Sequence, residues 1–247
     1  MMDLPRLVSE HIAPQRDSFR TDGDLPSAQH LLGLALAERR IRLKRITDGR
    51  WVFIFGGAII GGWANGVTTL VSAHGRRVLA SPESLAAHLD LMEIPHRIGP
   101  RSAAGDAQDG PAEERPEGTA PAAEKTVQPL TLEIYTAGRE AVSVLALVDR
   151  EQLAEPRPDD PQTIAVDVTD LAADELKQLG TDALRAVPGV LAGAAVLSAP
   201  SLDTAQGAVV VAVSEEASPL PHHFPTLGPG RPVSAAIAEQ ILAAAAV

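Results

Sequence analysis

The pattern of apolar and polar positions divides the first part of the chain into short helices and strands. In residues 27–46, leucines and an isoleucine recur at helical spacing behind Ser27, a favourable N-cap, and basic residues follow in the last turn. This pattern predicts a helix over about 27–40 and a strand over 41–46. Residues 51–55 form a dense apolar run that stops at a glycine pair, which is typical of a buried strand entering a loop.

Residues 51–71 also allow a second interpretation, a membrane helix. They carry no charge and follow a segment rich in arginine, as membrane helices often do. Glycines dilute their hydrophobicity, however, and Trp63 would lie near the bilayer centre instead of at its edge. We therefore favour a strand over 51–55 that enters a loop, and keep a membrane-associated protein that uses residues 51–71 as an alternative.

A change of composition then separates two halves. A helix begins after Ser81, a favourable N-cap followed by Pro82. Beyond it, residues 100–125 contain no large apolar side chain and are rich in Ala, Gly, Pro, Glu and Asp, which predicts a flexible linker. We therefore expect a leading domain over 1–99, a linker over 100–126 and a second lobe over 127–247.

The second half has the pattern of strands arranged around one helix. Its apolar runs predict a hairpin, a third strand, an amphipathic helix, two further paired strands and a terminal helix. These are expected at 130–135 with 141–148, at 163–168, at 172–187, within 190–199 and 205–214, and through Ala236, Ile237, Ile241 and Leu242.

Composition narrows the possible functions. The 247-residue chain has a formal net charge of -11, so nucleic acid and anionic membranes would be repelled over most of the surface, and neither is favoured as a partner. The absence of cysteine excludes disulfides, thiolate zinc sites and thiol nucleophiles. Aromatic residues make up only 3% of the chain, too few for a base-stacking platform. With no secretory leader before residues 3–16, a cytoplasmic location is expected.

Candidate chemistry gathers where an apolar strand over 209–214 runs into a proline-rich loop. Imidazole and carboxylate groups together suit zinc, iron or manganese. Their spacing here matches no metal-ligand motif, and prolines interrupt the segment. Ser214 lies in no Gly-x-Ser-x-Gly elbow. We therefore treat the segment as a possible binding loop that consists of Glu215, Glu216, His222, His223 and Arg231.

The order of several segments is similar to that of a known family. The segments are Leu132-Glu-Ile-Tyr-Thr-Ala-Gly-Arg-Glu140, Val166-Asp-Val-Thr-Asp170, Ala183-Leu-Arg-Ala-Val-Pro-Gly189, Leu191-Ala-Gly-Ala-Ala-Val196 and His223-Phe-Pro-Thr-Leu-Gly-Pro-Gly-Arg-Pro-Val233. In this order residues 127–247 resemble the carboxyl-terminal lobe of ATP-grasp ligases, which activate a carboxylate as an acyl-phosphate and join it to an amine. Residues 81–95 resemble that family's connecting helix and turn. The resemblance implies an α/β protein, with a Rossmann-like leading domain and an ATP-grasp-like α+β lobe.

Departures from the family pattern suggest lost chemistry. By the resemblance, Glu133 and Glu140 correspond to family residues on the nucleotide side of the site, and we expect them to be vestigial cofactor-binding residues. It places Ala195, Ala212 and Ser214 where the family has its magnesium ligands, and alanine offers magnesium no oxygen. The linker over 100–125 takes the interval in which the family has its nucleotide lobe.

We therefore predict a non-catalytic ATP-grasp-like subunit or binding module with no catalytic residue, metal or cofactor of its own. It is expected to assemble with itself or with an active ATP-grasp ligase. The alternative is an active carboxylate-amine ligase that uses ATP and magnesium. Its ligands would come from a partner chain or from displaced residues, namely Glu133, Glu140, Glu215, Glu216 and His223.

Overall fold

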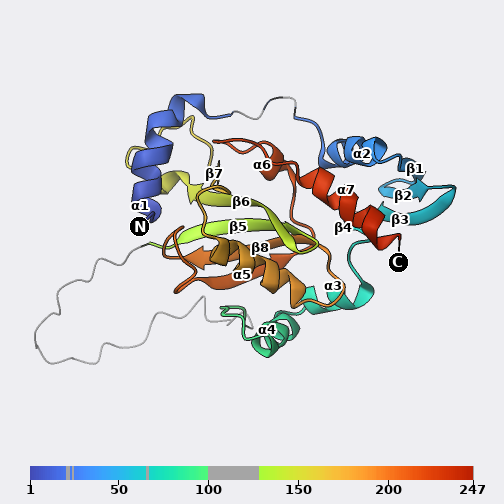
Figure 1. Ribbon diagram of the computed structural model, residues 1–247. Coiled ribbons are helices and arrows are strands. Elements are labelled where there is room, and N and C mark those ends of the chain that lie inside the picture. Colours follow the sequence, from blue (N-terminus) through green and yellow to red (C-terminus); the bar gives the residue numbers. More distant parts are fainter. Residues whose placement is uncertain (21–22, 24, 65–66, 100–127, 247) are drawn as a thin grey trace, which may run out of the picture.

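The structure is a computed structural model that describes residues 1–20, 23, 25–64, 67–99 and 128–246 (Figure 1). The predicted linker over 100–126 lies outside the described residues. The chain forms two sheets with helices around them, so the mixed α/β class expected from the sequence is confirmed.

The first sheet is a four-stranded antiparallel meander. Its order follows the sequence: β1 (Arg42–Thr47), β2 (Arg50–Phe55), β3 (Ala58–Ala64) and β4 (Val67–Thr68). Gly49, Gly56 and Gly57 have positive φ angles of 70°, 57° and 86°, which the tight turns between antiparallel strands require. The Rossmann-like order implied for this half is therefore wrong for this sheet, because such short turns leave no room for the crossovers that parallel strands need.

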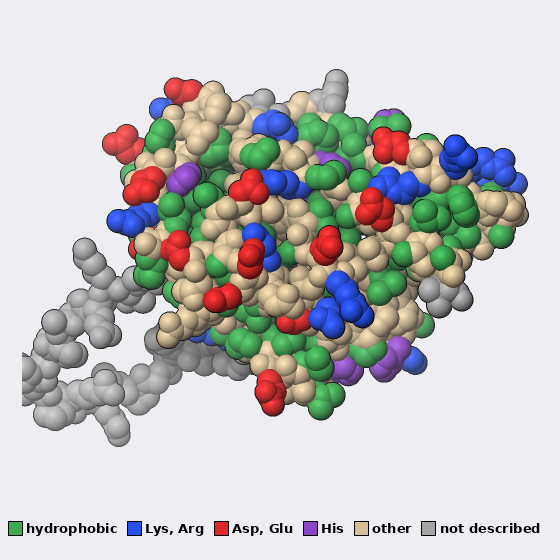
Figure 2. Space-filling model, in the orientation of Figure 1, with side chains coloured by type: hydrophobic (Ala, Val, Ile, Leu, Met, Phe, Trp, Pro, Cys, Tyr) green, Lys and Arg blue, Asp and Glu red, His purple; other side chains and the backbone are tan. Residues whose placement is uncertain are grey.

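The membrane-helix interpretation of residues 51–71 is also wrong. These residues form β2, β3 and β4. Among the residues that the structure describes, no helix is long and apolar enough to cross a membrane. Figure 2 shows Lys and Arg side chains gathered at the end of the molecule that carries this first sheet. The surface charge is thus uneven, although the net charge of the chain is -11.

The second sheet has five antiparallel strands in the order β7-β6-β5-β8-β9. They are β5 (Leu130–Ala137), β6 (Glu140–Asp149), β7 (Thr163–Asp167), β8 (Ala192–Ala199) and β9 (Val209–Ser214). The hairpin of β5 with β6 and the pairing of β8 with β9 confirm the predicted strands.

Helices cover both faces of this second sheet. One face packs against α5 (Asp174–Arg185), and the other against α6 (Leu220–His223) and α7 (Val233–Ala244). Gly180 lets α5 approach closely, since a Cβ there would lie 2.8 Å from the Ile134 side chain. The large core on the α5 face contains alternate residues of the strands, among them Leu132, Ile134 and Val144.

The remaining helices extend the cores. Their bounds are α1 (Leu4–Arg6), the π-helix η1 (Leu7–Ile12), the 3₁₀ helix η2 (Ala13–Ser18), α2 (Ala28–Glu38), α3 (Ala73–Leu79), α4 (Pro82–Leu91) and the 3₁₀ turn η3 (Arg150–Gln152). Side chains of α1, η1 and α4 join the large core. A smaller core joins α2 and the first sheet to α7 and to the near ends of β5 and β8. Each core thus contains residues from both sides of 100–127.

Candidate functional site

Polar side chains gather on the face of the second sheet that lies opposite α5. Side chains alternate along a strand, so Glu133 and Tyr135 of β5 share this face, while Ile134 belongs to the large core on the other face. Ser143 is paired with Tyr135 across the β5–β6 hairpin, and Asp167 ends β7 beside Leu145 of β6. Three neighbouring strands therefore present polar groups toward α6 and the segment after it.

His222 occupies the centre of this face. Its side chain is fully buried, its Nδ1 lies 2.8 Å from Ser143 Oγ, and its Nε2 lies 2.9 Å from Glu133 Oε1. The Tyr135 ring packs edge-on against the imidazole at 5.2 Å between centroids. A neutral imidazole that donates from Nε2 to the Glu133 carboxylate accepts the Ser143 hydroxyl hydrogen at Nδ1. Glu133 is therefore engaged in a contact within the protein.

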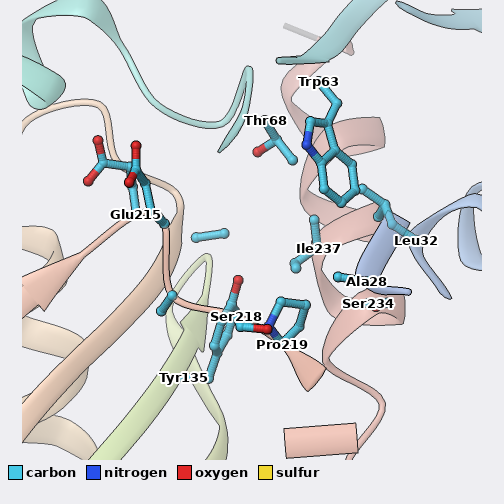
Figure 3. Close-up of a pocket in the computed structure, with 13 residues that line it drawn as sticks. Ala28, Leu32, Trp63, Thr68, Tyr135, Glu215, Ser218, Pro219, Ser234 and Ile237 are labelled. Carbon is cyan, nitrogen blue, oxygen red and sulfur yellow. The ribbon is translucent and has the colours of Figure 1, made fainter. Parts of the chain in front are cut away.

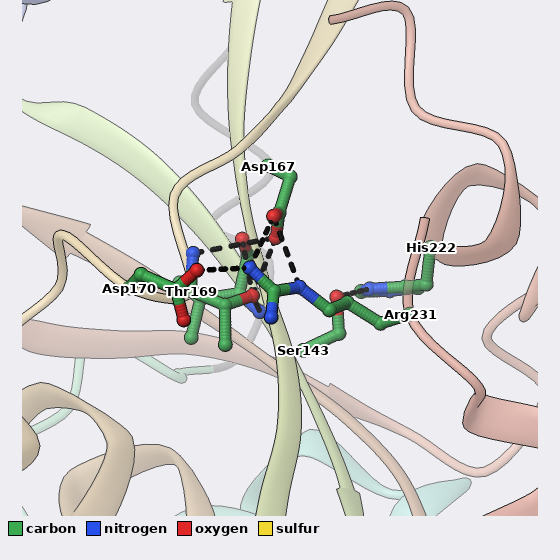
Figure 4. A network of polar contacts seen from close by, with 7 residues as sticks. Ser143, Asp167, Thr169, Asp170, His222 and Arg231 are labelled. Atoms are coloured by element: carbon green, nitrogen blue, oxygen red, sulfur yellow. Dashed lines mark hydrogen bonds and ion pairs between the residues drawn. The ribbon is translucent and has the colours of Figure 1, made fainter. Parts of the chain in front are cut away.

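Arg231 forms a second group of contacts at the edge of the same face (Figure 4). Its Nε and one terminal nitrogen donate to Asp167 Oδ2 at 3.0 and 2.6 Å, and that nitrogen also donates to Asp170 at 2.7 Å. The Thr169 hydroxyl donates to the other oxygen of Asp167 at 2.5 Å. These two carboxylates raise the pKa of Arg231, Asp167 more than Asp170. Both oxygens of Asp167, whose side chain is only 2% exposed, are thus satisfied internally.

Glycines let the loop that carries Arg231 lie close to the sheet. Gly228 has a φ of 94°, and a Cβ at Gly230 would collide with the carbonyl oxygen of His223. Leu227 pairs with β7 through hydrogen bonds to the backbone of Ala165 and Asp167. The segment from α6 to α7 is therefore tied along the sheet face, and it brings His222 and Arg231 to their carboxylates.

His223 contacts Ser234 of α7 and has a different role from His222. Its Nε2 accepts the backbone N–H of Ser234 at 3.0 Å, near the start of α7. Burial lowers the pKa of His223, and the neighbouring His222 lowers it further. A neutral imidazole that accepts an N–H in the first turn acts as a cap for α7, which has no side-chain cap at its own N-cap residue, Pro232. The two histidines are therefore not brought together as a ligand pair.

Glu215 and Glu216 follow β9 in the loop that leads to α6, and they line a cavity of about 200 Å³ (Figure 3). The cavity lies where the first sheet, α2 and α7 meet the second sheet. Tyr135 closes it from β5, and Trp63 from β3. Neither glutamate forms an ion pair with any residue that the structure describes. Of the predicted binding loop, only these two residues line this open space.

The predicted magnesium-ligand positions do not lie together. Ala195 pairs with Ile134 and Val213, and all three side chains belong to the core on the α5 face. Ala212 pairs with Val196, which pairs with Glu133 on the opposite face. Ala195 and Ala212 therefore face opposite sides of the sheet, since a shift of one residue along a strand turns the side chain to the other face.

The side chains on the correct face do not fit a magnesium ion either. Ala212 has no oxygen to offer, and the Ser214 hydroxyl accepts the backbone N–H of Glu216 at 3.1 Å. Glu140 is exposed at the tip of the β5–β6 hairpin, seven positions along the chain from Glu133. Within the described parts of the chain, no three His, Cys, Asp or Glu side chains lie close enough to hold a metal ion.

Sequence reasoning missed three polar residues of this face: Tyr135, Ser143 and Asp167. A signal existed for Tyr135, which is the only tyrosine of the chain and lies two positions after Glu133. Asp167 lies inside a segment that carries the family resemblance, but nothing in the sequence indicates its partner 64 positions away. The sequence carries no signal for Ser143, because a single serine within an apolar strand matches no functional motif.

Comparisons with known proteins bear on the fold alone. No family model and no curated protein matches the chain. The chain is similar to the crystal structure of a bifunctional glutathione synthetase from Pasteurella multocida, with a TM-score of 0.65 and 12% identity. The match covers 87% of this chain and 44% of that one, so the chain spans less than half the length of the synthetase.

A weaker likeness is to the ATP-grasp ligase PsnB complexed with a minimal precursor. Its TM-score is 0.35, with 11% identity over 47% of this chain and 34% of that one. The synthetase match therefore carries the comparison. The fold is ATP-grasp-like, as the sequence resemblance implied.

Proposed function

We propose that the protein is a non-catalytic ATP-grasp-like binding module. One observation carries the proposal: Glu133 and Asp167, the carboxylates on the α6–α7 face of the second sheet, are engaged by His222 and Arg231 of the same chain. A carboxylate held by a buried imidazole or by a guanidinium would have to exchange that partner for a metal ion. Breaking such a pair leaves an uncompensated group and costs several kcal/mol, by a rough estimate.

The segment from α6 to α7 supports this proposal by its position. It lies over the sheet face, and the backbone pairing of Leu227 with β7 anchors it. To expose Glu133, the segment would have to give up the His222 contacts with Ser143 and Tyr135 as well. A working metal site would instead keep its carboxylates directed at open space.

Calorimetric titration with ATP, with and without magnesium, tests the proposal. We expect no magnesium-dependent heat, because the sheet face has no free set of oxygen ligands. Saturable binding of ATP that requires magnesium would contradict the proposal and favour the alternative, an active ligase with displaced or partner-supplied ligands. A circular dichroism spectrum of the same sample confirms that the protein is folded during the titration.

We further propose that the module assembles through its first sheet, with a second copy or with an active ATP-grasp ligase. Ile59, near the turn between β2 and β3, is 68% exposed, and its cross-strand partner Ile54, on the same face of the sheet, is partly exposed. Exposed apolar side chains that lie together often mark a contact surface. Light scattering on the protein and on Ile59→Asp tests self-assembly. A dimer that the substitution dissociates supports it, whereas a monomer at every concentration contradicts it and leaves the ligase as the partner.

A further inference from the structure

The cavity of about 200 Å³ beside Glu215 has the features of a site for a small ligand. Its walls come from elements far apart in the sequence, namely α2, β3, β5, the loop after β9, and α7. Leu32 and Ile237 provide apolar wall, and Trp63 provides an aromatic one (Figure 3). Because an apolar cavity of about 150 Å³ holds a molecule the size of benzene, this one has room for a ligand of about seven or eight heavy atoms.

The hydroxyl of Tyr135 is directed into this cavity (Figure 3). The residue is only 4% exposed, yet its hydroxyl forms no hydrogen bond with any residue that the structure describes. Burial raises the pKa of Tyr135, and the nearby Glu133 raises it further, so the group stays protonated and can donate. The hydroxyl is accessible from the cavity and is therefore free to pair with a ligand that supplies an acceptor.

Two charged side chains line the cavity, and both are negative; the hydroxyl residues Thr68, Ser218 and Ser234 line it as well. Glu215 (Figure 3) and Glu216 line it, and no basic side chain among the described residues does. This contrasts with Glu133 and Asp167, whose charges are paired. Aromatic faces such as that of Trp63 also attract cations. Charge and shape together favour a cationic ligand with a short apolar body.

We propose that this cavity binds a small aliphatic ammonium ion that carries a hydroxyl group at its other end. The ammonium group lies at Glu215 and Glu216, the carbon chain contacts Leu32, Trp63 and Ile237, and the hydroxyl pairs with Tyr135. The site would be the ligand site of the binding module proposed above, and the inference rests on that function. No covalent step is involved.

Tryptophan fluorescence gives a direct test, because the chain has only two tryptophans. In the Trp51→Phe variant, Trp63 is the sole reporter, and it lines the cavity. The probes are amino alcohols of increasing length, from ethanolamine to aminohexanol. Pentanediol is the neutral control for aminopentanol, and aminovaleric acid tests whether a carboxylate is tolerated in place of the hydroxyl.

We expect saturable binding with an optimum of chain length, and at least tenfold weaker binding of pentanediol than of aminopentanol. In the Trp51→Phe background, Glu215→Gln combined with Glu216→Gln should weaken binding of the best amino alcohol about tenfold. Tyr135→Phe should weaken it about fivefold, the effect of one hydrogen bond. Arg139→Gln, on the β5–β6 turn and outside the cavity lining, is the control and should change nothing.

Two results would overturn the inference. One is no saturable fluorescence change with any amino alcohol, and the other is equal binding of pentanediol and aminopentanol. All titrations are made without nucleotide, so this failure is distinct from failure of the proposed function. Magnesium-dependent ATP binding would contradict the proposed function whatever the amino alcohols do.

Discussion

Two polar regions lie on the same face of the second sheet, and they differ in whether their charges are paired. Glu133 has a partner from α6, His222, and Asp167 has a partner from the segment that joins α6 to α7, Arg231. Around the cavity, Glu215, Glu216 and the Tyr135 hydroxyl have none among the residues that the structure describes. The first region holds the fold together, and the second is available to a ligand.

The difference shows that candidate residues close together in sequence can have unrelated roles. Glu215 and His222 are only seven positions apart, yet one lines a cavity while the other is fully buried against Ser143 and Glu133. Substitutions in the paired region should therefore reduce stability, and those around the cavity should not.

His222→Ala should have the largest effect. It removes a buried ring and leaves the Ser143 hydroxyl and the Glu133 carboxylate without their partner, so we expect a loss of about 3–4 kcal/mol in the free energy of unfolding. Urea denaturation measures it. His30→Ala, at an exposed position of α2, is the matched control and should lie within about 0.5 kcal/mol of wild type. A small loss at His222 would mean that this region is not closed as described.

Asp167→Asn and Asp170→Asn compare two carboxylates on one guanidinium. The side chain of Asp167 is 2% exposed and that of Asp170 is 79% exposed. We expect a loss of about 2 kcal/mol for Asp167→Asn, because the buried end of the Arg231 pair becomes uncompensated. For Asp170→Asn we expect about 0.5 kcal/mol or less. Equal losses in urea denaturation would show that burial does not set the strength of these contacts.

His223→Ala should cost about 1 kcal/mol, since it removes the group that accepts the Ser234 N–H at the start of α7. The pKa of His223 is lowered in the folded protein, so its protonation disfavours the folded state. The stability that neutral His223 provides is therefore complete above pH of about 6.5, the unfolded value, and declines as the pH falls below it. His223→Gln should show a weaker decline over this range in urea denaturation at several pH values. An identical pH dependence in the variant would contradict the capping role.

The combined substitution Glu215→Gln and Glu216→Gln should have the smallest effect. Neither carboxylate is paired with a described residue, so its charge makes no contact that folding depends on, and we expect a change within about 0.5 kcal/mol. Thermal unfolding without added ligand measures it. A loss as large as that of Asp167→Asn would show that these carboxylates have structural partners, and it would remove the distinction between the two regions.

Much of the fold could be predicted from the sequence, because it follows from local patterns. Ser27 caps α2 and Ser81 caps α4 as expected, and the apolar runs of the second half are strands in the predicted pairs. β3 was missed because its glycines interrupt the apolar alternation. One of them, Gly62, lies so close to β2 that a Cβ would be 2.6 Å from the Trp51 carbonyl oxygen.

The candidate site was less predictable, for physical reasons. The pairing of Glu133 with His222 spans 89 positions, and no local pattern encodes it. The apolar run predicts the strand that carries Ala195 but not that its side chain faces α5, opposite the face of Ala212. The pairing of β8 with β9 also contains a register shift. Val196 pairs with Ala212, but the next residue, Leu197, pairs with Val210, so the chain of β9 advances by two residues where that of β8 advances by one.

Imidazole nitrogen NMR of His222, in protein labelled at histidine, tests the central claim most directly. The claim is that this ring holds Glu133 and Ser143 and keeps the sheet face closed to nucleotide and metal. We predict that both ring nitrogen shifts of His222 stay unchanged when ATP and magnesium are added together. A saturable shift of the nitrogen bonded to Glu133, seen only when both are present, would contradict the account, because it would show that the carboxylate leaves His222 for the metal.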